Sequence, residues 1–93
     1  MDDSPIYIGA MHVTIIIPDA RSLKDKRRAI RSLTDKINSR FQVSCNLLGE
    51  GEHPGRQRIV LTSAGKDLGQ LKKLFDKVRF FLDSFDRAWP GTV

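Results

Sequence analysis

The feature that most constrains the fold is a long alternating segment near the start of the chain. Residues 6–17 are rich in β-branched side chains, and one face of the alternation carries Tyr7, Gly9, Met11, Val13, Ile15 and Ile17. This period of two predicts a strand over residues 6–17 with that face toward the core. Pro18 ends the strand because proline has no N–H to donate to a neighbouring strand.

After Pro18 the hydrophobic period changes from two to about 3.6 residues, which indicates a helix. Ser22 is a suitable N-cap residue, and Asp25 three positions later can complete a capping box. The hydrophobic residues that follow share one narrow stripe of the helix: Leu23, Ile30, Leu33, Ile37 and Phe41. The sequence therefore predicts a first helix that begins at Leu23.

Two further strands are predicted in the middle of the chain. Residues 42–48 alternate again, with Cys45 and Leu47 on the same face. Residues 49–55 contain three glycines and a proline, which indicates a loop. The third strand is predicted over residues 58–64, with Ile59 and Leu61 toward the core.

A second helix follows, capped by Ser63 or Asp67. Its predicted buried stripe consists of Leu68, Leu71, Leu74, Phe75, Val78, Leu82 and Phe85. Phe80 lies outside that stripe, and we expect the tail to cover it. Residues 1–5 are expected to be flexible, and residues 86–93, with Trp89, to form an irregular tail or a short edge strand.

The order of elements predicts an α+β fold. Ninety-three residues allow one domain with one modest core, which we assign to residues 1–93. The order βαββα, with an optional last strand, indicates a ferredoxin-like sandwich, an antiparallel sheet with both helices on one face. Right-handed crossovers would pair the first strand with the third and place both at the centre of the sheet.

The other face of that sheet is left open by this arrangement. It would display a mixture of apolar and polar side chains, among them Ile8, His12, Ile16 and Val60. These four residues are our candidates for an oligomer interface, because a second copy could cover them in a C2 homodimer. The alternative is a half-solvated sheet face on a monomer, which is common in antiparallel sheets.

Composition narrows the class of protein. One cysteine excludes an intramolecular disulfide, and with two histidines it makes a structural zinc site very unusual. The longest aliphatic run is three isoleucines, far short of the ~20 residues that span a bilayer. The chain begins Met1-Asp2-Asp3, acidic where a signal peptide would be basic, so we expect a cytoplasmic protein without a membrane partner. No motif indicates a metal or another cofactor.

The positive charge of the chain is concentrated in the first predicted helix. The net charge is +5, yet residues 21–40 contain eight basic residues opposed only by Asp25 and Asp35, which gives this segment +6. The remainder of the chain carries −1. This asymmetry makes the surface of the first predicted helix the candidate site for an anionic partner.

Two segments of the chain resemble a known family. One runs from Gly9 to Leu33 and includes Ser22-Leu23-Lys24-Asp25-Lys26-Arg27-Arg28, and the other is Arg40-Phe41-Gln42-Val43-Ser44. Both are similar to the YlxP-like family of small bacterial proteins, which has no assigned biochemical function. The resemblance implies a ferredoxin-like fold. It also implies a role in ribosome maturation or RNA handling, because the family's genes often lie near those for translation initiation and ribosome-binding factor A.

The chain departs from the family in two places. Family members usually carry an acidic segment followed by Trp and Gln between the second and third strands, where this chain has residues 49–57. The family's long last strand is shortened or replaced by residues 86–93. Any role of that loop or strand in the family is not carried over to this chain.

The basic residues of the first helix are the candidate nucleic-acid contacts. At 100° per residue, Lys24, Arg27, Arg28 and Arg31 fall on one flank beside the apolar stripe. Lys26 falls nearly over the stripe, where it must extend outward or make a specific contact. All five are predicted to bind phosphates of ribosomal or pre-ribosomal RNA without reading bases. The alternative is a solvated helix face, with the homodimer as the protein's functional form.

Recognition of bases on the open sheet face, and catalysis, both lack support in the sequence. RNA-recognition motifs stack bases on aromatic residues of the central strands, and the third strand has none. A small hydrolase would need backbone amides converging near Arg21, but the connection from Pro18 contains no glycine. Cys45 is predicted on the core face, where it would be inert. We therefore expect a binding protein and not an enzyme.

Overall fold

The computed structural model describes residues 3–17, 21–49 and 55–87. Along the chain these form β1 (Tyr7–Ile16), α1 (Leu23–Arg40), β2 (Ser44–Leu47), β3 (Arg56–Gly65) and α2 (Leu68–Arg87). The two predicted helices and the first three predicted strands are present, the predicted strand boundaries lie within two residues of the observed ones, and α1 begins at Leu23 as predicted. Neither helix in the described part of the chain is long and apolar enough to cross a membrane.

The three strands form one antiparallel sheet in the order β1-β3-β2. Tyr7 lies opposite Gly65 and Ile16 opposite Arg56, so β1 and β3 pair over their full lengths. β2 pairs with β3 from Ser44 to Leu47. The predicted pairing of the first and third strands is confirmed. Within the described residues β3 is the central strand and β1 an edge strand, because the optional fourth strand would fall on residues 88–93, outside the described residues.

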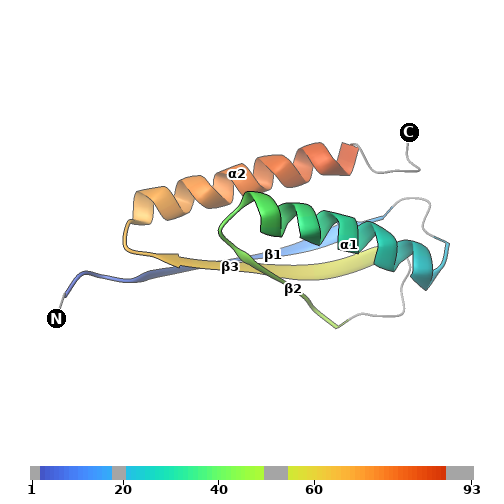
Figure 1. The fold of residues 1–93 in the computed structure, drawn as a ribbon, viewed down its shortest axis with the longest axis horizontal. Coiled ribbons are helices and arrows are strands. Elements are labelled where there is room, and N and C mark those ends of the chain that lie inside the picture. The colour runs from blue at the N-terminus through green and yellow to red at the C-terminus, as the bar shows by residue number, and fades with distance from the viewer. Residues whose placement is uncertain (1–2, 18–20, 50–54, 88–93) are drawn as a thin grey trace.

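Both helices lie on the same side of the sheet, with α2 along β1 and α1 beside β2 (Figure 1). The βαββα order and the two-layer arrangement make this a ferredoxin-like α+β fold, as the sequence predicts. The opposite face of the sheet carries no helix among the described residues. This layout places the basic α1 at the side of the molecule where the short β2 ends the sheet.

The core is built where α1 and α2 meet the inner face of β3. Its largest fully buried side chains come from three elements: Leu33, Ile37, Ile59, Leu61 and Val78. Burial of each such side chain contributes about 1.5–3 kcal/mol, which fixes the rotation of α1 about its axis. The apolar stripe of α1 therefore faces the sheet, and the flank that carries its cations faces outward.

The start of α2 resolves one alternative and corrects one prediction. Asp67 is the cap, because its Oδ1 accepts the N–H of Gln70 at 3.0 Å, whereas the Ser63 hydroxyl donates to the carbonyl of Gln42 at 2.8 Å. The predicted burial of Leu68 is wrong, since its side chain is 43% exposed. As the first residue of α2 it lies beyond the part of the helix that packs on the core.

The end of α2 shortens the predicted tail. The helix continues through Arg87, so residues 86 and 87 are helical. Residues 88–93, including Trp89 of the predicted tail, lie outside the described residues, as does the side chain of Phe85. Phe80 is 75% exposed, which confirms that it lies outside the buried stripe.

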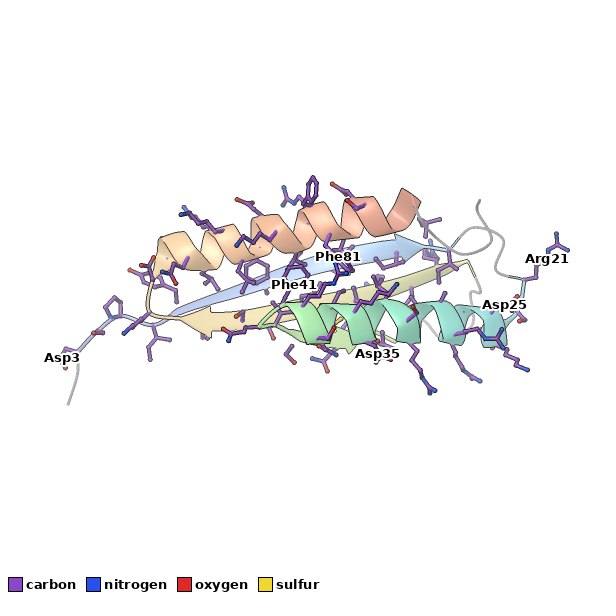
Figure 2. All side chains as sticks on the ribbon, turned by 45° about the horizontal axis from the view of Figure 1, so that its top comes forward. Asp3, Arg21, Asp25, Asp35, Phe41 and Phe81 are labelled. Carbon is purple, nitrogen blue, oxygen red and sulfur yellow. The ribbon has the colours of Figure 1, made fainter. Side chains whose placement is uncertain are left out.

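Two close contacts hold the helices in place. A Cβ atom added to Gly9 of β1 would overlap the ring of Phe75, so this ring of α2 packs directly on the backbone of the strand. Between the helices, the rings of Phe41 and Phe81 meet edge to face with centroids 5.6 Å apart, and the guanidinium of Arg40 lies 5.1 Å from the Phe81 centroid (Figure 2).

Candidate nucleic-acid interface

The N-terminus of α1 is fixed by its cap. The Ser22 hydroxyl accepts the N–H of Asp25 at 3.1 Å, as the sequence predicts. The Asp25 carboxylate accepts the N–H of Arg21 at 3.4 Å instead of closing the predicted box on Ser22. Figure 2 shows Arg21 and Asp25 together at this end of the helix. The cap sets where the helix begins and therefore which direction each following cation faces.

Four of the five predicted phosphate-binding residues are exposed on one flank of α1. We call this set the basic flank; it consists of Lys24, Arg27, Arg28 and Arg31. Their spacing of three, one and three residues places them on adjacent turns of the same side of the helix. The structure thus brings these four predicted residues together on the surface.

Lys26 differs from the other four cations. Its side chain is 4% exposed, because its position on α1 falls among the buried residues Ile30, Leu33 and Ile37. The sequence places Lys26 over the apolar stripe, and the burial agrees with that position. The exposed basic flank is therefore a set of four residues, and Lys26 belongs to the groove beside it.

A groove lies between α1 and the end of β2, with a volume of about 350 Å³. We call it the α1–β2 groove. Arg27 and Arg31 of the basic flank line it together with Asp35. Its apolar lining comes from Ile30 and Leu47, and the two buried polar side chains that line it are Lys26 and Gln57. The groove combines exposed cations, an apolar surface and buried polar groups within one small volume.

Gln57 fixes the shape of this groove. Its side chain is 5% exposed, and its Nε2 donates to the carbonyl oxygens of Leu48 at 2.7 Å and Arg58 at 2.8 Å. The N–H of Leu48 also donates to the carbonyl of Arg58 at 2.9 Å. These bonds hold the chain leaving β2 against β3, so the position of Leu47 in the groove is set by the sheet.

The groove is not predicted from the sequence, because the exposure of Leu47 and the burial of Gln57 both differ from the prediction. Leu47 does lie on the helix-facing side of β2 with Cys45, but it is 54% exposed because α1 does not cover it. The predicted third strand begins at residue 58 and so excludes Gln57, which is in fact the second residue of β3. Extending the period of two backward from Leu61 and Ile59 would have found it.

The four candidate interface residues lie on the helix-free face of the sheet. Ile8 is 79% and Ile16 55% exposed, and His12 is also exposed. Val60 is half-buried and lies directly opposite His12 in the β1–β3 pairing. The structure brings His12 and Val60 together at the middle of this face and places Ile8 and Ile16 toward its two ends. Their role in an oligomer stays a prediction.

The fold and the exposed basic flank describe a small α+β protein with a ferredoxin-like architecture. The chain belongs to the family described as "Protein of unknown function (DUF503)", whose family model matches residues 8–89. It is similar to the uncharacterized protein YlxP of Bacillus subtilis (strain 168), with 30% identity over 78 residues that cover 84% of this chain and 85% of that protein. The resemblance to the YlxP-like family is confirmed, and neither description assigns an activity.

Proposed function

We propose that this protein is a non-enzymatic RNA-binding protein that docks on ribosomal or pre-ribosomal RNA through the basic flank of α1. The observation that carries the proposal is the exposure of Lys24, Arg27, Arg28 and Arg31 on one side of a helix whose segment carries +6. Exposed cations in a row supply affinity and orientation on a phosphate backbone without reading its sequence.

The dimensions of the flank suit such a backbone. Residues 24 and 31 are separated by about 10 Å along the helix axis, at a rise of about 1.5 Å per residue. One strand in helical geometry presents one phosphate charge per about 3.4 Å of the helix axis. The four cations therefore meet enough phosphates for each to have its own contact.

The position of the cations argues against a purely stabilising role. The partial positive charge at a helix N-terminus favours acidic side chains in the first turn and disfavours basic ones. Asp25 is the only acid in the first turn of α1, and Lys24 and Lys26 flank it. The basic residues add repulsion at this end of the helix, and a bound phosphate would relieve it.

A salt titration with a charge-reversal variant tests the proposal. Binding to purified small-subunit ribosomal RNA is measured for the wild type and for Arg27→Glu with Arg31→Glu. Four phosphate contacts predict a slope of log K against log salt near about −3, and loss of two contacts reduces it to about −1.5. The matched control is Lys72→Glu with Lys73→Glu, which makes the same charge change at two exposed positions of α2.

The results separate specific docking from general attraction. We expect the α1 variant to lose most of its affinity while the α2 variant keeps most of it, with both unfolding at wild-type urea concentrations. A wild-type affinity that does not change with salt contradicts the proposal. Equal losses for the two variants contradict the assignment to α1, because they would mean that only net charge matters.

The helix-free sheet face favours a second function, a homodimeric protein-interaction module. The specific observation is the exposure of Ile8 and Ile16, which a monomer leaves in contact with water. A second copy of the chain that covers this face would bury both. Sedimentation at low micromolar concentration tests it: we expect a dimer that Ile16→Lys dissociates and that Phe80→Lys, at an exposed position of α2, leaves intact. A wild-type monomer contradicts this function.

A further inference from the structure

The α1–β2 groove opens beside the basic flank and shares two of its residues. Arg27 and Arg31 are exposed and also line the groove. An RNA backbone held by the flank therefore passes the groove at those two arginines. A group attached to that backbone at close range can enter the groove, and in RNA the attached group is the base.

The lining of the groove suits the flat face of a base. Leu47 offers an apolar surface that is 54% exposed, and the buried Ile30 of α1 lies at the base of the groove with only 3% exposure. Bases bind proteins by stacking on flat side chains, including the guanidinium planes of arginines. Arg27 and Arg31 can therefore bind a phosphate or stack on the base that follows it.

The buried polar side chains of the groove suit the edge of a base. Both hydrogens of the Gln57 amide are committed to the carbonyls of Leu48 and Arg58, which turns its Oε1 away from them as an acceptor. The Asp35 carboxylate lines the same groove and is also an acceptor. These acceptors match the N–H donors on the edges of bases. In a base pair those donors are already used, so only an unpaired base can offer them.

The size of the groove limits what can enter. A volume of about 350 Å³ lies at the lower end of small-molecule sites and is large enough for one base. A base in a duplex would first have to leave its stack, at a cost of a few kcal/mol. An unpaired base in a loop, bulge or single strand pays no pairing cost.

We propose that the α1–β2 groove receives one unpaired base of the bound RNA, so that the protein selects single-stranded segments over duplex. The proposal rests on the RNA-binding function of the basic flank and names the form of RNA that this surface takes. The flank supplies affinity for phosphates, and the groove supplies the preference for unpaired nucleotides.

Three RNA oligonucleotides test it, all binding being followed by fluorescence anisotropy at the same salt concentration. The first is a single strand, the second is the same strand in a duplex, and the third is the single strand with abasic positions, which keeps the phosphates and removes bases. We expect the intact single strand to bind at least about 5-fold more tightly than the abasic strand, because only the intact strand has a base that can be buried in the groove. The duplex should bind more weakly than the intact single strand.

Two variants link this preference to the groove. Leu47→Ala should weaken binding of the intact single strand at least about 3-fold, because it removes apolar surface that the base would cover, and leave binding of the abasic strand unchanged. Leu68→Ala, which shortens an exposed leucine at the start of α2, should change neither. Equal affinity for the intact and abasic strands, or tighter binding of duplex, overturns the groove proposal while leaving the basic flank in place. Failure to bind any of the three RNAs overturns both proposals.

Discussion

Replacing Gly9 with alanine tests the contact between the backbone of β1 and the Phe75 ring of α2. A Cβ atom at this position would lie 3.1 Å from Cζ and 3.2 Å from Cδ2 of Phe75, and closer still to Cε2. Such overpacking costs about 1–3 kcal/mol. Alanine regains about 0.5–1 kcal/mol over glycine within a strand, so the middle of the two ranges gives a net destabilisation of about 1 kcal/mol. For a chain of this length that lowers the melting temperature by about 4–8 °C.

Gly65 supplies the matched control, because it lies in the same sheet and a Cβ added there would meet nothing within 4 Å. Urea unfolding followed by circular dichroism should show a lower midpoint with an unchanged slope for Gly9→Ala, and a midpoint equal to or above wild type for Gly65→Ala. Adding Phe75→Leu to Gly9→Ala should cost less than the sum of the two single changes, because the smaller side chain gives way. If Gly9→Ala is as stable as Gly65→Ala, the reasoning about this contact is wrong.

Three further predictions concern other parts of the fold. Ser22→Ala removes the acceptor that caps α1 and should cost about 1 kcal/mol in urea unfolding. Phe81→Leu removes the edge-to-face contact with Phe41 and the contact with Arg40, and should cost about 1–2 kcal/mol, with less effect when Arg40 is already alanine. Burial raises the pKa of the Cys45 thiol above its ordinary 9.0, so the unfolded chain loses this proton first as the pH rises. Stability should therefore fall more steeply above pH 9.0 for the wild type than for Cys45→Ala, and an equal fall would contradict this account.

Much of the fold could be predicted from the sequence because its boundaries are marked by strong local signals. Pro18 and Ser22 separate β1 from α1 within a few residues, and the hydrophobic period changes between them. Asp67 marks the start of α2 in the same way. The start of β3 carries no such signal, because Arg56 and Gln57 are polar. Gln57 shares the buried face of Ile59 and Leu61, and its polar amide is accommodated there because it donates to the carbonyls of Leu48 and Arg58.

The sequence predicts on which face of its helix or strand each residue of the candidate site lies, but not the shape of the groove. Helical spacing puts Lys24, Arg27 and Arg31 on one flank and Lys26 over the apolar stripe, and burial of Lys26 agrees with that position. A period of two puts Leu47 on the inner face of its strand. It could not show that Leu47 stays 54% exposed beside α1, since the spacing between a helix and a neighbouring strand is set by tertiary packing.

The four cations of the basic flank also make the free protein sensitive to its ionic surroundings. They lie within about 10 Å of one another on exposed positions, close to the screening length at physiological salt, so they repel one another when no anion is bound. Added salt should therefore stabilise the free protein, because it screens this repulsion. Under the proposed function the same salt weakens RNA binding. One titration would thus move the melting temperature upward and the affinity downward, and both trends would originate in a single face of one helix.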